Sequence, residues 1–120
     1  MIAELDGIFT PVILGSSYRA LRLALRLKLT YGVTSHIFDT RHSLALRALP
    51  FTVCHSISYS SEEILLIDLE RTARLHEHTI LYLTPTKEPY VSFVNRMRSQ
   101  LEDKFVIVTD PCDFDPKRRE

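Results

Sequence analysis

Two short segments combine small, hydroxyl-bearing and basic residues in the way that a site for a small anion would need. The first is Gly15-Ser16-Ser17-Tyr18-Arg19, and the second is Thr84-Pro85-Thr86-Lys87-Glu88. Small residues let a ligand approach the backbone closely, and the unpaired amides at a helix start favour a negative charge. The candidate substrate-binding residues are therefore Gly15, Ser16, Ser17, Arg19, Thr84, Thr86 and Lys87.

An ordinary structural role would explain several of the same residues. Gly15 could serve a tight turn, and Ser16 or Ser17 could cap the helix that follows it. Thr86 could cap a later helix in the same way, because serine and threonine are favoured N-caps. The sequence therefore leaves both capping and ligand binding open for these two segments.

A dinucleotide site fits the sequence poorly. The first turn of such a site needs Gly-x-Gly-x-x-Gly, but Gly15 stands alone, with Ser17 and Ala20 at the other two glycine positions. Asp39 follows the second predicted strand, where an acid that binds ribose is expected, and it is equally explained as a turn residue. We therefore expect no NAD or FAD, and no cofactor held by this chain.

Histidine offers a second kind of chemistry. His36 and His55 fall in predicted strands, where a hydrogen-bonded interior or edge position competes with a role as catalytic base. An independent enzyme that uses His55 or Asp39 is therefore a further hypothesis. Its activity should disappear when either residue is replaced by alanine.

Metal and thiol chemistry have weaker signals. His76 and His78 are two residues apart near a predicted helix end, on different faces, and no third ligand has metal spacing, so we expect no metal site. Cys54 precedes His55 in a strand, and adjacent strand side chains face opposite ways, which rules out a Cys-His nucleophile there. Cys54 and Cys112 are expected to stay reduced.

Apolar periodicity predicts the elements that position these residues. Strands are expected at 11–14, with Phe9 as a further candidate, and at 33–38, 51–57, 79–83 and 105–108. Long helices are expected at 17–31, about 62–75 and 89–101, with a short helix within 40–49. Ser60 and Glu63 have the spacing of a capping box. In the first helix the predicted apolar face contains Tyr18, Leu21, Ala24, Leu25 and Leu29, opposite Arg19, Arg22 and Arg26. Leu23 and Leu27 flank this face, and their burial on the sheet is favoured over packing on a partner.

Strands that alternate with helices predict the fold class. Such a chain forms an α/β domain with a mostly parallel sheet covered on both faces. Right-handed crossovers make a single doubly wound, five-stranded sheet in the order 3-2-1-4-5 the leading topology. Ligands of such sheets bind where the winding reverses, between the first and fourth strands, and the two candidate segments meet there.

Composition narrows the class of protein. The chain has 120 residues with 15 Lys plus Arg and 15 Asp plus Glu, so no overall field attracts nucleic acid or a membrane surface. The first residues carry acids where a secretory signal would be basic, so we expect a cytoplasmic protein. Residues 1–110 are expected to form the domain, and 111–120 a linker or disordered tail.

The N-terminal half resembles a known family. Pro11-Val12-Ile13-Leu14-Gly15-Ser16-Ser17-Tyr18-Arg19-Ala20-Leu21-Arg22-Leu23-Ala24, followed by Tyr31-Gly32-Val33 and a strand, resembles the start of ATP-grasp carboxylate-amine ligases like D-aspartate ligase. In that family a Rossmann-like pre-ATP-grasp domain precedes the lobes that bind ATP and magnesium. Members often carry an acid soon after the first glycine, where this chain has Ser17.

The resemblance implies a supporting role. The loop from Gly15 to Arg19, with the segment from Thr84 to Lys87, would form one wall of a cleft for a carboxylate substrate. ATP and Mg would bind only to the remaining ATP-grasp lobes, which are expected beyond this sequence and as its partners. The chain alone would then neither hydrolyse ATP nor form an amide bond. The alternative is a stand-alone Rossmann-like module that binds a small anionic ligand in the same cleft.

Overall fold

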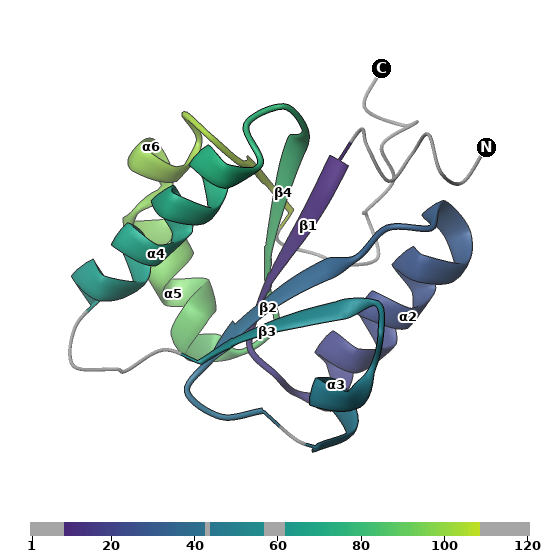
Figure 1. Cartoon of the computed structure of the whole chain (residues 1–120). Coiled ribbons are helices and arrows are strands. Elements are labelled where there is room, and N and C mark those ends of the chain that lie inside the picture. The colour runs from purple at the N-terminus through teal and green to yellow at the C-terminus, as the bar shows by residue number, and fades with distance from the viewer. Residues whose placement is uncertain (1–8, 43, 57–61, 109–120) are drawn as a thin grey trace.

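Five parallel strands form one sheet in the order β3-β2-β1-β4-β5 (Figure 1). The computed structural model describes residues 9–42, 44–56 and 62–108. The strands are β1 (Phe9–Leu14), β2 (Ser35–Asp39), β3 (Thr52–Ser56), β4 (Ile80–Pro85) and β5 (Val106–Ile107). The α/β class and the strand order confirm the prediction, because short helical crossovers between parallel strands leave few other windings.

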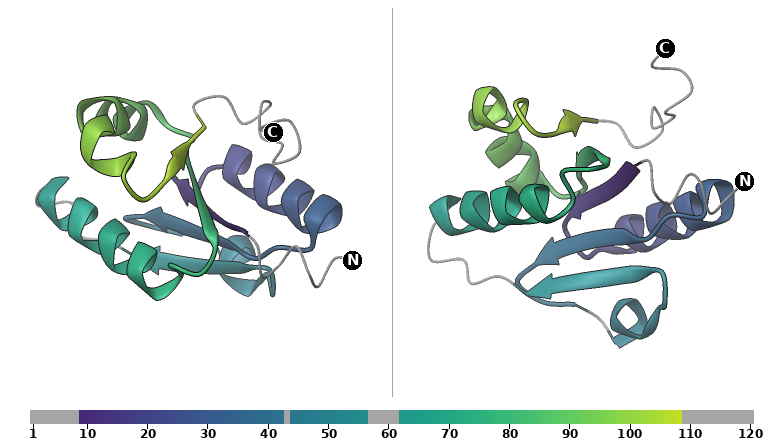
Figure 2. Two further views of the ribbon diagram at one scale, coloured as in Figure 1. Left: turned by 90° about the horizontal axis from the view of Figure 1, so that it is seen from above. Right: turned by 45° about the horizontal axis from the view of Figure 1, so that its top comes forward.

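Helices cover both faces of the sheet (Figure 2). On one face lie α2 (Tyr18–Tyr31) and α3 (Leu44–Ala48), and on the other α4 (Glu62–Leu75), α5 (Glu88–Arg96) and α6 (Arg98–Leu101). The apolar residues of β1 alternate between the two layers. Val12 and Leu14 join a core with Leu69 of α4, whereas Phe9 and Ile13 join a core with α2.

The buried face of α2 agrees with the prediction at Ala24, Leu23 and Leu27 and differs from it at Tyr18, Leu25 and Leu29. Its buried residues are Ala20, Leu23, Ala24, Leu27 and Tyr31, whereas Tyr18, Leu25 and Leu29 are exposed. Leucine occupies every second position from 21 to 29, so it appears on all sides of a helix with 3.6 residues per turn. Only one face can pack, and the small Ala20 and Ala24 allow the closest approach to the sheet.

The predicted helix at 89–101 is two helices. α5 ends at Arg96 and α6 begins at Arg98, with Met97 between them at φ −102° and ψ 15°. The amide of Met97 still bonds the carbonyl of Phe93, and the amide of Leu101 bonds that of Met97, so the break is a local bend. Pro89 does stand in the first turn, as predicted. Ser60 of the predicted capping box and the predicted tail at 111–120 lie outside the described residues.

Candidate functional site

The carboxyl ends of β2, β1 and β4 are held together at the point where the winding reverses. The amide of Gly15 donates to the carbonyl of Phe38 at 2.8 Å, and the amide of Thr86 donates to that of Leu14 at 2.9 Å. The Thr86 hydroxyl donates to the same Leu14 carbonyl at 2.9 Å. The two predicted segments therefore meet here, and backbone bonds fix their spacing.

Both the backbone conformation at position 15 and the lack of space for a Cβ atom require glycine there. Its φ of +109° is rarely adopted by residues with a side chain. A Cβ at this position would lie 2.6 Å from Oγ1 of Thr86 and 3.1 Å from Cγ of Lys87. The glycine therefore lets the β1–α2 turn approach the β4–α5 turn, which is the structural role that the sequence left open.

Asp39, the last residue of β2, lies at the centre of the cluster. Its Oδ2 accepts hydrogen bonds from the Ser16 amide at 2.8 Å and from Lys87 Nζ at 2.6 Å. Its Oδ1 accepts from the Thr40 amide and the Tyr90 hydroxyl, each at 2.7 Å. The Ser16 hydroxyl lies 3.1 Å from Oδ2 and also against the carbonyl of Arg41; its single proton serves one of the two at a time.

These contacts keep Asp39 ionised although it is buried, with 4% of its surface exposed. Burial alone would raise the pKa of Asp39, but hydrogen bonds from Lys87, Ser16, Tyr90 and Thr40 outweigh it and hold the pKa well below its ordinary value. A carboxylate that is buried and engaged by this many donors is closed to a ribose diol. The geometry therefore gives Asp39 a structural role and weakens the dinucleotide interpretation further.

The start of α2 is left open beside this cluster. Ser17 is the N-cap residue, but its side chain makes no capping hydrogen bond. Its Oγ is enclosed and has no hydrogen-bond partner among the residues that the structure describes. The first turn of α2 contains no acid, and Arg19 is exposed there. The first-turn amides of the helix therefore have no side-chain cap from Ser17 to neutralise them.

The predicted site residues fall into three groups. Gly15, Ser16, Thr86 and Lys87 form the joined turns, and Lys87 keeps 40% of its side chain exposed. Ser17 and Arg19 lie at the open start of α2. Thr84 is different: it lies inside β4 beside Ile13 and is 2% exposed, so it does not reach the cleft surface.

Of the capping alternatives, Ser17 does occupy the N-cap position of α2, whereas Thr86 is not the N-cap residue of α5. Lys87, not Thr86, is the N-cap residue of α5, and it makes no side-chain capping bond. The Thr86 hydroxyl instead bonds the Leu14 carbonyl and so joins β4 to β1.

The sequence did not indicate Tyr90 and Thr40 as members of the Asp39 cluster. The sequence pattern makes Tyr90 a core residue of an amphipathic helix, and only the tertiary packing of α5 aims its hydroxyl at Asp39.

A second polar cluster lies where β2 and β3 meet α4. Nδ1 of His36 lies 2.9 Å from Nε2 of His55, and the His55 ring stacks on Phe38 with centroids 4.2 Å apart. His76 approaches the His36 ring at 4.8 Å. Burial lowers the pKa of His36 to about 4, with the nearby His55 and His76 adding to the effect. Burial also lowers the pKa of His55, against the opposing charge of Asp68.

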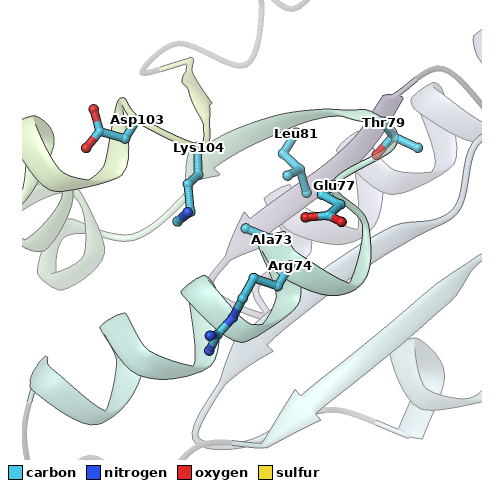
Figure 3. A pocket seen from close by; sticks show the side chains of 7 residues that line it. All are labelled: Ala73, Arg74, Glu77, Thr79, Leu81, Asp103 and Lys104. Atoms are coloured by element: carbon cyan, nitrogen blue, oxygen red, sulfur yellow. The ribbon is translucent and has the colours of Figure 1, made fainter.

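Two hollows flank this side of the sheet. One of about 270 Å³ lies beside His55 and is lined also by Phe38, Asp68 and Arg71. The other, of about 220 Å³, is drawn in Figure 3 between the end of α4 and the segment before β5. Its charged residues have both signs, with Arg74 and Glu77 from the α4 side and Asp103 and Lys104 opposite them. None of the predicted binding residues lines either hollow.

In the ranges 9–42, 44–56 and 62–108, no group of three or more His, Cys, Asp or Glu side chains is placed to hold a metal ion. No helix within these ranges has the length and apolar character to cross a membrane.

Comparisons with protein-family models, curated proteins and solved structures find no match to this chain. Membership of the ATP-grasp family therefore stays a prediction that rests on the residues of the N-terminal half.

Proposed function

We propose that this chain binds a small carboxylate-bearing ligand at the amino end of α2, as the substrate-side domain of an ATP-grasp carboxylate-amine ligase. The observation that carries the binding half is the open start of α2, where Ser17 provides no cap and its enclosed hydroxyl has no described partner. A carboxylate oxygen there would accept from the first-turn amides.

The electrostatics of the surrounding residues support an anion. Asp39 and Lys87 neutralise each other across 2.6 Å, so the buried carboxylate does not repel a second one strongly. Arg19, in the first turn of α2, and Arg41, whose carbonyl contacts the Ser16 hydroxyl, are both exposed. With the positive end of the α2 dipole added, the local charge is favourable for a carboxylate.

The ligase half of the proposal comes from the resemblance of the first strand, turn and helix. In it, ATP and magnesium belong to partner lobes, and this chain supplies a wall of the substrate cleft. A stand-alone module that binds a small anion would use the same residues. The two differ in whether ATP-grasp lobes complete the cleft.

Amide chemical shifts test the binding half. Titration of the ¹⁵N-labelled chain with acetate, D-aspartate and phosphate should shift amides 16–20 most, with saturation in the millimolar range because the site is only one wall. Arg19→Gln should weaken the carboxylate response about threefold or more, on the scale of one exposed charge. Arg22→Gln, one turn further along α2, is the matched control and should leave the response unchanged.

Two results would overturn the proposal. Unchanged shifts at 16–20 with all three anions would remove the binding site. Tight, saturable binding of ATP by this chain alone would contradict a substrate-side role. The coding sequence after Glu120 tests the ligase half separately: ATP-grasp lobes there would support it, and a stop codon with no adjacent ligase gene would favour the stand-alone module.

A further inference from the structure

α2 has a second line of apolar side chains that is exposed in the part of the chain that the structure describes. Tyr18 is 70% exposed, Leu25 44% and Leu29 72%. The guanidinium of Arg22 lies 5.8 Å from the centroid of the Tyr18 ring, which places it along the same line of side chains. These four residues, Tyr18, Arg22, Leu25 and Leu29, are here called the outer stripe.

The outer stripe has the geometry of a helix-helix seam. Its spacings of four, three and four residues match the a and d positions of a heptad. At 100° per residue the four positions fall within about 60° of one another, on the side of α2 opposite Leu27, which is 1% exposed. The stripe runs for about 17 Å, or three turns.

The charge around the outer stripe has a single sign. α2 contains Arg19, Arg22, Arg26 and Lys28 and no acidic residue. Arg19 flanks the stripe on one side and Lys28 on the other, as the e and g positions flank a seam. Because the whole chain has no net charge, this is a local concentration of positive charge on one helix.

We propose that the outer stripe of α2 docks an amphipathic helix of a partner protein whose own seam is apolar and whose flanking positions are acidic. The apolar side chains would interdigitate, and acids of the partner would pair with Arg19, Arg22 and Lys28. This proposal does not depend on the ligand proposed for the start of α2.

Two other occupants fit the residues less well. A second copy of α2 would bring four positive charges against four, which opposes pairing. A helix that lies in a membrane interface needs a broad apolar face, and a stripe about 60° wide has the narrow form of a seam instead.

The probe is a 21-residue helical peptide with leucine at a and d and glutamate at e and g. Fluorescence anisotropy should show binding to the intact chain that weakens as salt rises. Leu29→Gln and Arg22→Glu should each weaken it at least fivefold. Ile67→Gln on α4 removes a similarly exposed aliphatic residue and should have no effect. All of these positions are at the surface, so circular dichroism should report unchanged folding.

Each other outcome counts against the proposal. Equal affinity for a peptide with lysine at e and g would remove the charge argument, and equal affinity of the Leu29→Gln variant would remove the stripe. A dimer in light scattering that Leu29→Gln abolishes would assign the stripe to a second copy. Sedimentation with phosphatidylglycerol vesicles, lost in the same variant, would assign it to a lipid surface.

Discussion

Asp39 shows how one side chain can organise the end of a sheet. It joins the turn after β1, through the amide of Ser16, to the start of α5, through Lys87 and Tyr90. A buried carboxylate is stable only when its lone pairs are filled, and here four donors on separate residues fill them. The cluster therefore fixes the position of the α2 start, where the ligand is proposed.

Replacing Asp39 should destabilise the domain. Asp39→Asn removes the charge and sets an NH₂ group against the donors at one of the two carboxylate positions, which should cost about 2–4 kcal/mol of unfolding free energy. Urea unfolding at pH 7 measures this loss of unfolding free energy. Lys87→Met is the paired variant and should cost less, about 1 kcal/mol, because 40% of the Lys87 side chain is exposed.

The stability difference between wild type and Asp39→Asn should also depend on pH. Because the folded pKa of Asp39 is depressed, its stabilisation is present above the ordinary value of 3.8 and is lost as pH falls through the folded pKa. The difference between wild type and Asp39→Asn should therefore shrink below about pH 4. A difference that stays constant to pH 2 would contradict an ionised Asp39.

Among the elements, α2 is ambiguous in sequence. Leucine at alternate positions supplies an apolar residue in every direction, and the helix settles on the sheet through Ala20 and Ala24. The face of α2 that is buried is therefore determined by its packing against β1 and β2 and not by the spacing of its apolar residues.

Two alanine variants on α2 test that choice of face. Leu27→Ala should cost about 2–4 kcal/mol, because Leu27 is 1% exposed and its removal leaves a cavity. Leu29→Ala should change stability by less than about 0.5 kcal/mol, because its side chain is largely in solvent. Thermal or urea unfolding distinguishes the two variants. Equal losses of unfolding free energy would contradict the burial of Leu27 and the exposure of Leu29.

The junction of β2, β3 and α4 should be sensitive to acid. The folded pKa of His36 is about 4, below the ordinary 6.5, so its neutral form stabilises the fold above pH 6.5 and this stabilisation is lost as pH falls from 6.5 through 4. Discounted for partial exposure, the loss is about 2 kcal/mol. Protonation of His36 would bring positive charge against His55 and His76.

The pH effect is measured by unfolding free energy between pH 7 and 4.5. His36→Gln should flatten the curve relative to wild type, while the exposed His78→Gln should keep the wild-type slope. Identical slopes for all three proteins would place the acid sensitivity elsewhere.

For the molecule as a whole, the sheet order determines where stability is concentrated. β1 is the central strand, with β2 and β4 on either side of it and cores on both faces, whereas β3 and β5 are edge strands. Native-state hydrogen exchange should therefore find the slowest amides in β1 and β4, near the global unfolding free energy. Amides of β3 should exchange by local opening at lower free energy. Equal protection of β3 and β1 would contradict this distribution.

The sequence by itself determined the class of fold, the strand order and the meeting of the two polar segments. These follow from local signals, such as the apolar run before Gly15 and Pro89 in a first helical turn, together with the handedness of crossovers. Only the tertiary structure decided that Asp39 is the centre of the cluster, that the Thr86 hydroxyl joins β4 to β1, and that α2 leaves Leu25 and Leu29 exposed. Each of these depends on which surfaces meet, and contacts between residues such as Asp39 and Tyr90, 51 positions apart, leave no periodic trace in the chain.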